Sequence, residues 1–459
     1  MRECKLRPAH VARAPEGVDS SAPKYDAAVQ NYLVTTLDGG ARVVTEPLPT
    51  VRSVAIGFWI GAGSRDEDDT HAGVSHFLEH LLFKGSRSYS AVDIAEVFDT
   101  FGGELNAATA RDYTVVYARV MDDHLETALD VMTDMVFAPT LADLDAEREV
   151  VLEEIAMVED TPQELIFDLI TSAVFGDHAL GRPVLGSADV ISSISRRSVG
   201  AYHRRRYRPD NVVVAAAGSV DHGELVGLVE RMVQKASEPP ARKGSARTPL
   251  VAPPPPSLVF RERDTEQYHV CLAAPGIARS DRRRFTASIL DGVLGGSASS
   301  RLFQEIREKR GLAYAVYTFS SQYADTGQIG IYVGTREENL AECLRIAAEQ
   351  IEAIAADGPR PDELARAKEN LKGRIMLAME LTSNRMSRLG KSLITDSELL
   401  SLDRLLAEIE AVDADAVAGL AGVLLGLDLF SVAAIGSNEA RFLEAVEPVC
   451  PGLVERAAA

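Results

Sequence analysis

The sequence predicts an α+β fold of two homologous domains, each with a mixed or antiparallel sheet packed against helices. One observation is length, because 459 residues exceed what a single hydrophobic core usually organises. The other is an internal repeat. Segments 270–274, 337–344 and 431–437 resemble segments 54–58, 122–129 and 213–219, at offsets of 216, 215 and 218 residues. Three separated matches at nearly one offset indicate a duplicated domain.

Composition narrows the class of protein. A hydrophobic content of 46% and a charged content of 25% are typical of a soluble globular chain. The formal net charge is −20, which argues against nucleic acid and against an anionic membrane surface as partners. Such a charge would attract a basic peptide, although a solvated acidic surface is the simpler explanation.

The N-terminal residues and the cysteines give no sign of secretion. Residues 1–30 carry charges and prolines without an apolar core segment, so we expect a flexible N-terminal tail and a cytoplasmic protein. The four cysteines are scattered without CxxC spacing, which indicates neither a disulfide framework nor a cysteine metal site. The apolar stretch 416–435 contains Asp428 and three glycines. It predicts a helix followed by a buried strand rather than a membrane span.

The first domain is predicted to span residues 31–236. Hydrophobic periodicity and turn residues predict strands at 41–45, 54–60, 113–120 and 212–218, and helices at 73–84, 91–101, 123–137, 147–157 and 225–233. Residues 237–256 are rich in proline and carry no apolar periodicity, which predicts a linker. The second domain then spans 257–459, with a strand at 270–274 and a helix at 302–309.

The segment His76-Phe-Leu-Glu-His80 is the main candidate for chemistry. On a helix His76 and His80 stand one turn apart on one face, with Glu79 beside them. Zinc binds imidazole nitrogen, and a catalytic zinc keeps three protein ligands and an open position for water. The HxxEH pattern therefore predicts a metallopeptidase with a metal-activated water. The alternative is an amphipathic helix whose histidines are ordinary surface or core residues.

The third zinc ligand is expected among the glutamates of the predicted helix 147–157. Glu147 and Glu154 are seven residues apart and share a face, so either could reach a metal, whereas Glu149 and Glu153 lie on another face. The duplication does not repeat the metal residues. The offset of 216 carries His76 and His80 onto Gly292 and Gly296, so the two halves share a scaffold but not this chemistry.

The second half offers a cation and a phenol instead. Arg307 and Tyr314 flank a turn at Gly311 and could project toward a common point. Such donors suit the oxyanion that forms when water attacks a peptide carbonyl. Taken alone, an arginine and a tyrosine seven residues apart are ordinary structural residues.

Taken together, segments 76–80, 147–154 and 307–314 resemble the inverted-motif zinc peptidases of the pitrilysin and insulin-degrading-enzyme family. Within it they resemble the short-chain branch typified by mitochondrial processing peptidase, from about Tyr32 to Ser437. The resemblance implies that His76, His80 and Glu154 bind one zinc ion per chain and that Glu79 is the general base. It gives Glu147 the role of a supporting carboxylate behind the ligands.

The resemblance also implies how a peptide is held. Asn106 and Ala107 fall in an edge strand that pairs with the substrate backbone, and Phe77 would line the pocket beside the scissile bond. Arg307 and Tyr314 match the pair that holds the substrate carbonyl. In this branch two chains close around a chamber, so a homodimer is expected in which Arg307 and Tyr314 of one chain complete the site of the other.

The sequence therefore predicts a zinc-dependent endopeptidase that cleaves unfolded peptides or presequence-like segments inside a closed dimer. One alternative is a non-catalytic structural core subunit of the same fold, against which the complete residue set argues. The other is one member of an obligate heterodimeric peptidase.

Overall fold

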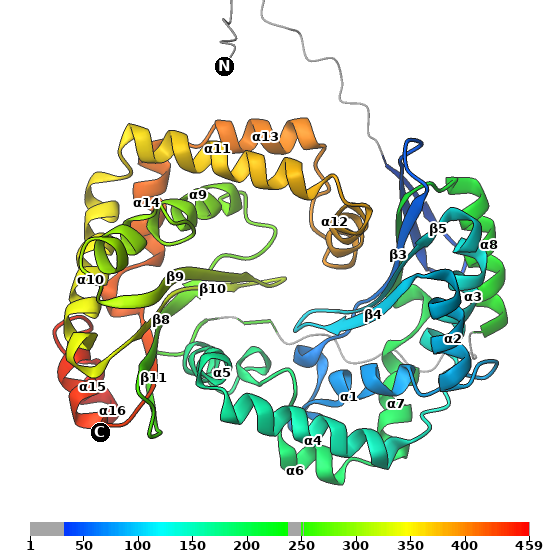
Figure 1. Cartoon of the computed structure of the whole chain (residues 1–459), viewed down its shortest axis with the longest axis horizontal. Coiled ribbons are helices and arrows are strands. Elements are labelled where there is room, and N and C mark those ends of the chain that lie inside the picture. Colours follow the sequence, from blue (N-terminus) through cyan, green and yellow to red (C-terminus); the bar gives the residue numbers. More distant parts are fainter. Residues whose placement is uncertain (1–31, 237–248, 251, 459) are drawn as a thin grey trace, which may run out of the picture.

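The computed structural model describes residues 32–236, 249–250 and 252–458, and places one sheet in each half of the chain (Figure 1). The strand orders are β1-β2-β6-β3-β5-β4 and β7-β11-β8-β10-β9. In each sheet one pair is parallel, β2 with β6 and β7 with β11, and the other pairs are antiparallel. From β2 and β7 onward the two orders correspond strand for strand. This confirms the α+β class and the duplication.

The strands have the following bounds. The first sheet comprises β1 Leu33–Thr36, β2 Arg42–Pro47, β3 Ser53–Ile60, β4 Glu104–Thr109, β5 Thr114–Met121 and β6 Val212–Gly218. The second comprises β7 Leu258–Glu262, β8 Tyr268–Gly276, β9 Ala313–Gln322, β10 Gly327–Thr335 and β11 Ser431–Gly436. The strand expected at 212–218 is confirmed at both ends. β1 and β7 were not predicted, because both are short and largely exposed or half-buried, which leaves little periodicity to detect.

The helices of the first half are α1 Val74–Leu82, α2 Ala91–Phe101, α3 Leu125–Phe137, α4 Leu144–Asp160, α5 Pro162–Phe175, α6 Ala188–Ser193, α7 Arg196–Arg206 and α8 His222–Ala236. Those of the second are α9 Arg284–Leu294, α10 Leu340–Asp357, α11 Pro361–Ala378, α12 Thr382–Ile394, α13 Leu402–Glu410, α14 Ala414–Leu424, α15 Glu439–Val446 and α16 Leu453–Ala458.

Two of the sequence predictions for helices can be checked closely. The helix expected at 302–309 is a π-helix, Phe303–Glu308. The apolar stretch 416–435 forms α14 followed by the buried β11, as predicted. Within the described part of the chain, no helix combines the length and the apolar character needed to cross a bilayer.

One helix from each half packs on the sheet of the other half. α5 lies against β8 and β11, and α12 lies against β3 and β6 (Figure 1). The contacts are apolar: Ile166 and Ile170 of α5 join the cluster around Cys271, and Met386 of α12 joins that around Trp59. Both faces of each sheet are thereby covered. This explains why β6 is a continuous apolar run that is buried throughout.

The docking of α12 is close and specific. Trp59 Nε1 donates a hydrogen bond to Met386 Sδ at 3.4 Å. A Cβ atom at Gly390 would lie 2.0 Å from Trp59 Nε1, so only glycine fits there. Glu46 of β2 also accepts hydrogen bonds from Arg385 and Arg388 of α12. These contacts fix the second half against the first.

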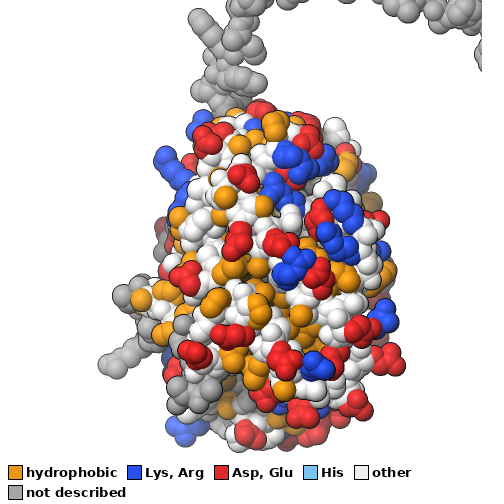
Figure 2. All heavy atoms as spheres, turned by 90° about the vertical axis from the view of Figure 1, so that its left-hand side faces the viewer, with side chains coloured by type: hydrophobic (Ala, Val, Ile, Leu, Met, Phe, Trp, Pro, Cys, Tyr) orange, Lys and Arg blue, Asp and Glu red, His pale blue; other side chains and the backbone are white. Residues whose placement is uncertain are grey.

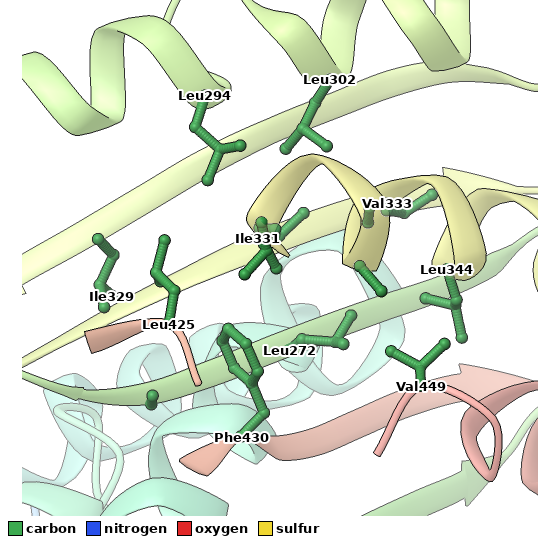
Figure 3. Packing of buried hydrophobic residues seen from close by; sticks show 14 of the residues in the cluster. Leu272, Leu294, Leu302, Ile329, Ile331, Val333, Leu344, Leu425, Phe430 and Val449 are labelled. Carbon is green, nitrogen blue, oxygen red and sulfur yellow. The ribbon is translucent and has the colours of Figure 1, made fainter. Parts of the chain in front are cut away.

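Each half has its own core on the other face of its sheet. In the second half, Leu272 of β8 and Ile331 of β10 meet Leu344 of α10 and Phe430 (Figure 3). The outer face of this half carries acidic, basic and apolar side chains side by side (Figure 2). The predicted tail at 1–30 lies outside the described residues, and so does most of the predicted linker at 237–256. The domain bounds therefore stay predictions.

Candidate metal centre

The two histidines lie on one face of α1. Their ring centroids are 4.8 Å apart, as expected for residues one turn apart. The other face carries Leu78, Leu81 and Leu82, all fully buried in the first core. Burial of this apolar stripe fixes the rotation of α1, so that His76 and His80 face α4.

Glu154 of α4 completes a three-residue cluster. Its Oε2 lies 3.6 Å from His76 Nε2 and 3.5 Å from His80 Nε2. Tetrahedral zinc with bonds of about 2.0–2.1 Å separates neighbouring ligand atoms by about 3.4 Å. The spacing of these three atoms therefore fits zinc. Of the two glutamates that the sequence left open, Glu154 is the one that faces the Nε2 atoms of both histidines.

The protonation of His76 also fits a metal ligand. Burial, and to a smaller extent the nearby His80, lower its pKa to about 4, so the ring is neutral at physiological pH. Its buried Nδ1 has no hydrogen-bond partner among the described residues. A neutral imidazole with Nε2 directed at a carboxylate is the form that binds a metal ion.

Glu147 contacts His80 through Nδ1, the ring nitrogen that does not face Glu154. It is 7% exposed, and its Oε2 accepts from His80 Nδ1 at 3.3 Å while Oε1 lies 2.7 Å from Lys84 Nζ. A carboxylate on the second ring nitrogen orients a ligating histidine and raises its basicity. Glu149 and Glu153 are exposed, as expected from their place on another face of α4.

Glu79 lies on the same helix, with a partner that the sequence did not reveal. Thr109 Oγ1, at the end of β4, donates a hydrogen bond to Glu79 Oε2. Burial raises the pKa of Glu79, and the hydrogen bond from Thr109 acts against this rise. A carboxylate with a raised pKa, held in one orientation, suits a general base at neutral pH.

A buried carboxylate pins the start of α1. Glu67 is 6% exposed and accepts hydrogen bonds from the N–H groups of Gly73 and Ser75, each at 2.7 Å. Arg182 donates to the Glu67 carbonyl at 2.6 Å. Burial raises the pKa of Glu67 to about 7, against the effect of the two N–H donors. The sequence analysis did not identify Glu67, because its contacts with α1 depend on the folded loop.

Asn106 and Ala107 lie in β4, at one end of the first sheet's strand order. The Ala107 N–H donates to Asn106 Oδ1 at 2.8 Å. The donor is therefore satisfied by a side chain that an incoming strand could displace. The predicted edge strand is confirmed, whereas its role in holding substrate stays a prediction.

The prediction for Phe77 was wrong. Its side chain is fully buried in the first core, because the residue after His76 is rotated by about 100° around the helix. It therefore lines no substrate pocket. Phe83, one turn beyond Glu79 and His80, lines a pocket of about 630 Å³ with Ile94 and Phe98 of α2 and with β4. The i,i+3 spacing from His80 could have identified it.

Arg307 and Tyr314 do come together. The guanidinium carbon of Arg307 lies 4.4 Å from the centre of the Tyr314 ring, and Nη1 donates to the Tyr314 carbonyl at 3.1 Å. The Tyr314 side chain is directed outward and is 76% exposed. The pair belongs to the second half, whereas the metal cluster belongs to the first (Figure 1).

Comparisons with known proteins agree with this geometry. Residues 42–188 match the family described as insulinase, peptidase family M16, and residues 193–371 match the peptidase M16 inactive domain. An uncharacterized zinc protease of Streptomyces coelicolor is 44% identical over 401 residues, covering 85% of this chain and 87% of that protein. The uncharacterized zinc protease YmxG of Bacillus subtilis is 41% identical, covering 86% and 95%.

Solved structures share the fold. A peptidase M16 inactive domain from Pseudomonas fluorescens superposes with a TM-score of 0.82 at 23% identity, covering 89% of this chain and 98% of that one. A protease from Helicobacter pylori gives 0.82 at 20% identity, covering 88% and 99%. The solved structures thus share the fold, and the sequence matches across both halves establish that the chain belongs to peptidase family M16, the pitrilysin family of zinc metallopeptidases.

Proposed function

We propose that this protein is a zinc-dependent endopeptidase with one zinc ion per chain, which cleaves unfolded peptides or presequence-like segments. The observation that carries the proposal is the convergence of Glu154 Oε2 on the Nε2 atoms of His76 and His80, with Glu79 on the same helix. When bound, zinc would polarise the scissile carbonyl and lower the pKa of a bound water. Glu79, oriented by Thr109, would accept the proton of the attacking water.

The open edge of β4 supports an extended peptide as substrate. A strand laid along β4 would take over the Ala107 N–H that now binds Asn106 Oδ1. The apolar pocket lined by Phe83, Ile94 and Phe98 lies along the same strand and would accept an apolar side chain. Most backbone groups of a folded protein are already hydrogen-bonded, so unfolded segments are the expected substrates.

Arg307 and Tyr314 support a homodimer. Their outward-facing pair lies on the half opposite the metal cluster, so we propose that a second copy supplies them. Tyr314 would then donate to the oxyanion formed on the substrate carbonyl. A closed chamber between two copies follows from this arrangement. A cytoplasmic location stays a prediction.

The first experiment is mass spectrometry of unstructured peptides after incubation with the purified chain. We expect cleavage that a chelator stops and zinc restores. Glu79→Gln should keep its zinc and lose cleavage, whereas the matched control Glu149→Gln, an exposed glutamate of α4, should behave as wild type. A lone chain that binds zinc and leaves every peptide intact would favour the structural-subunit or heterodimer alternative.

The second experiment tests the dimer by mixing two inactive variants. A Glu79→Gln chain and a Tyr314→Phe chain should together regain about a quarter of wild-type activity, because half of the random dimers are mixed and one of their two sites is intact. If both residues act within one chain, the mixture stays as inactive as its components.

A further inference from the structure

A pocket outside the metal centre lies between α9, α12 and α13. It encloses about 230 Å³ and is lined by four cationic side chains, Arg279, Arg284, Arg388 and Lys391. Ser392 and Ser397 add hydroxyl groups, and Phe285, Leu399 and Leu405 add apolar surface. α12 packs on the first sheet whereas α9 and α13 belong to the second half. The pocket is therefore at the junction of the two halves.

The pocket's cations outnumber the carboxylates that pair with them. Arg279, Arg284 and Arg388 pair with Asp112, Glu398 and Glu46 at 3.5, 3.8 and 3.4 Å. Asp112 is shared with Arg65, which also binds Asp325, and Glu46 is shared with Arg385. These pairs join five arginines to four carboxylates, and Lys391 adds a sixth cation without a carboxylate of its own. An excess of two positive charges is notable in a chain of net charge −20.

Two donors of the pocket residues lack an anionic partner within the described ranges. The Nε of Arg388 is buried without a hydrogen bond there. No ion pair of Lys391 occurs among the same residues, and its Nζ lies 5.8 Å from the centre of the Tyr113 ring. Desolvation by the surrounding protein and then the charge of Arg279 lower the pKa of Lys391, and the charge of Asp112 acts in the opposite direction. Buried polar groups are normally satisfied, so the Arg388 Nε calls for a ligand, and Lys391, which is exposed, offers its ammonium group to the same ligand.

We propose that this pocket binds a small phosphate-class anion, either inorganic phosphate or the phosphoryl group of an organic ester. A phosphate dianion matches the excess of two charges, and guanidinium and ammonium groups are its usual protein ligands. The hydroxyls can donate to further phosphate oxygens, and the apolar surface can cover the carbon part of an ester. Because such a ligand binds only the folded chain, it stabilises the junction of the two halves.

The test is thermal unfolding of the full chain in increasing inorganic phosphate, against sodium chloride of equal ionic strength. Phosphate should raise the melting temperature of the wild type beyond the effect of chloride. Lys391→Gln should weaken the apparent affinity by about tenfold or more, the usual range for one charge-assisted hydrogen bond. The control Lys372→Gln removes the same charge from α11, where Lys372 pairs with Glu410 outside the pocket, and should respond as wild type.

Lys391→Gln was chosen because it leaves no carboxylate unpaired, and its melting temperature without phosphate shows that it folds. An equal phosphate response in Lys391→Gln and wild type would overturn the proposal. A phosphate response that is lost when zinc is stripped would also overturn the proposal, since the anion would then bind at the metal.

Succinate acting as well as phosphate would overturn the phosphate assignment. Tighter binding of phenyl phosphate than of phosphate would identify an ester ligand, and equal or weaker binding would identify the free anion. Neither the melting temperature nor the apparent affinity for the anion depends on peptidase activity.

Discussion

The first half places the candidate metal centre between α1 and α4, and the second half brings α9 and α11 together around the corresponding positions. The duplication offset of 216 residues relates His76, Glu147 and Glu154 to Gly292, Glu363 and Asn370. The last three line one pocket of only about 20 Å³. The second half has therefore kept the helix pair, and has lost the imidazoles and the ligand carboxylate.

A buried glutamate occupies the corresponding position in both halves. Glu147 is 7% exposed and Glu363 6% exposed. Glu147 is held by Lys84 and His80, whereas Glu363 accepts two hydrogen bonds from Arg301, at 3.1 and 2.8 Å. A buried carboxylate needs hydrogen-bond donors or a cation around it, and at this position both halves supply a cation. The glutamate at this position is therefore part of the shared scaffold, whereas the histidines and Glu154, the candidate zinc ligands, have no counterpart in the second half.

The largest effect is expected from making the first half more like the second at Glu154. Glu154→Gln places an amide where the second half has Asn370. A protein zinc site is worth about 10–16 kcal/mol in total, so the loss of one ligand should weaken zinc binding by about a hundredfold or more. Zinc content after dialysis measures this. The adjacent exposed Glu153→Gln is the control, and zinc retained at wild-type affinity in Glu154→Gln would contradict the ligand assignment.

The paired substitutions Glu147→Gln and Glu363→Gln sharpen the comparison further. Glu147→Gln should weaken zinc binding by about 10–100-fold, the usual effect of losing a carboxylate behind a ligating histidine. Glu363→Gln should leave zinc affinity unchanged and cost about 3 kcal/mol of folding free energy, because Arg301 remains buried and unpaired. Zinc titration and chemical denaturation separate the two. Loss of zinc affinity in both variants would show that Glu363 acts on the metal centre.

The smallest effect is expected at the N-termini of α1 and α9. α1 is pinned by Glu67, whereas at the start of α9 the Asp281 carboxylate accepts from one N–H, that of the N-cap residue Arg283, whose own side chain makes no cap. Glu67→Gln offers one acceptor for two N–H donors, and should cost about 1–3 kcal/mol of stability. By loosening α1 it should also weaken zinc binding several-fold.

The Glu67 measurement belongs above neutral pH, where the carboxylate is ionised despite its raised pKa. Asp68→Asn, in the exposed neighbour that caps the next turn, is the matched control. A less stable protein with unchanged zinc affinity would restrict Glu67 to a purely structural role.

Much of this architecture was accessible from the sequence because it rests on local periodicity. The positions of His76, Glu79 and His80 on one helix follow from helical geometry within five residues. The strand 212–218 was recognisable from its apolar run, and the repeat offsets predicted two corresponding sheets. The family resemblance added the role of Glu154, which spacing alone could not separate from that of Glu147.

Other features depend on contacts between distant segments, which local patterns do not encode. His80 and Glu147 are 67 residues apart, and Trp59 and Met386 are 327 apart. Only packing decides that α5 and α12 cover the sheets of the opposite halves, that Thr109 reaches Glu79, and that Phe77 points into the core. The sequence by itself determined which side chains share a helix face. The tertiary structure decided what each face meets, because burial of apolar surface fixes the rotation and docking of every element at once.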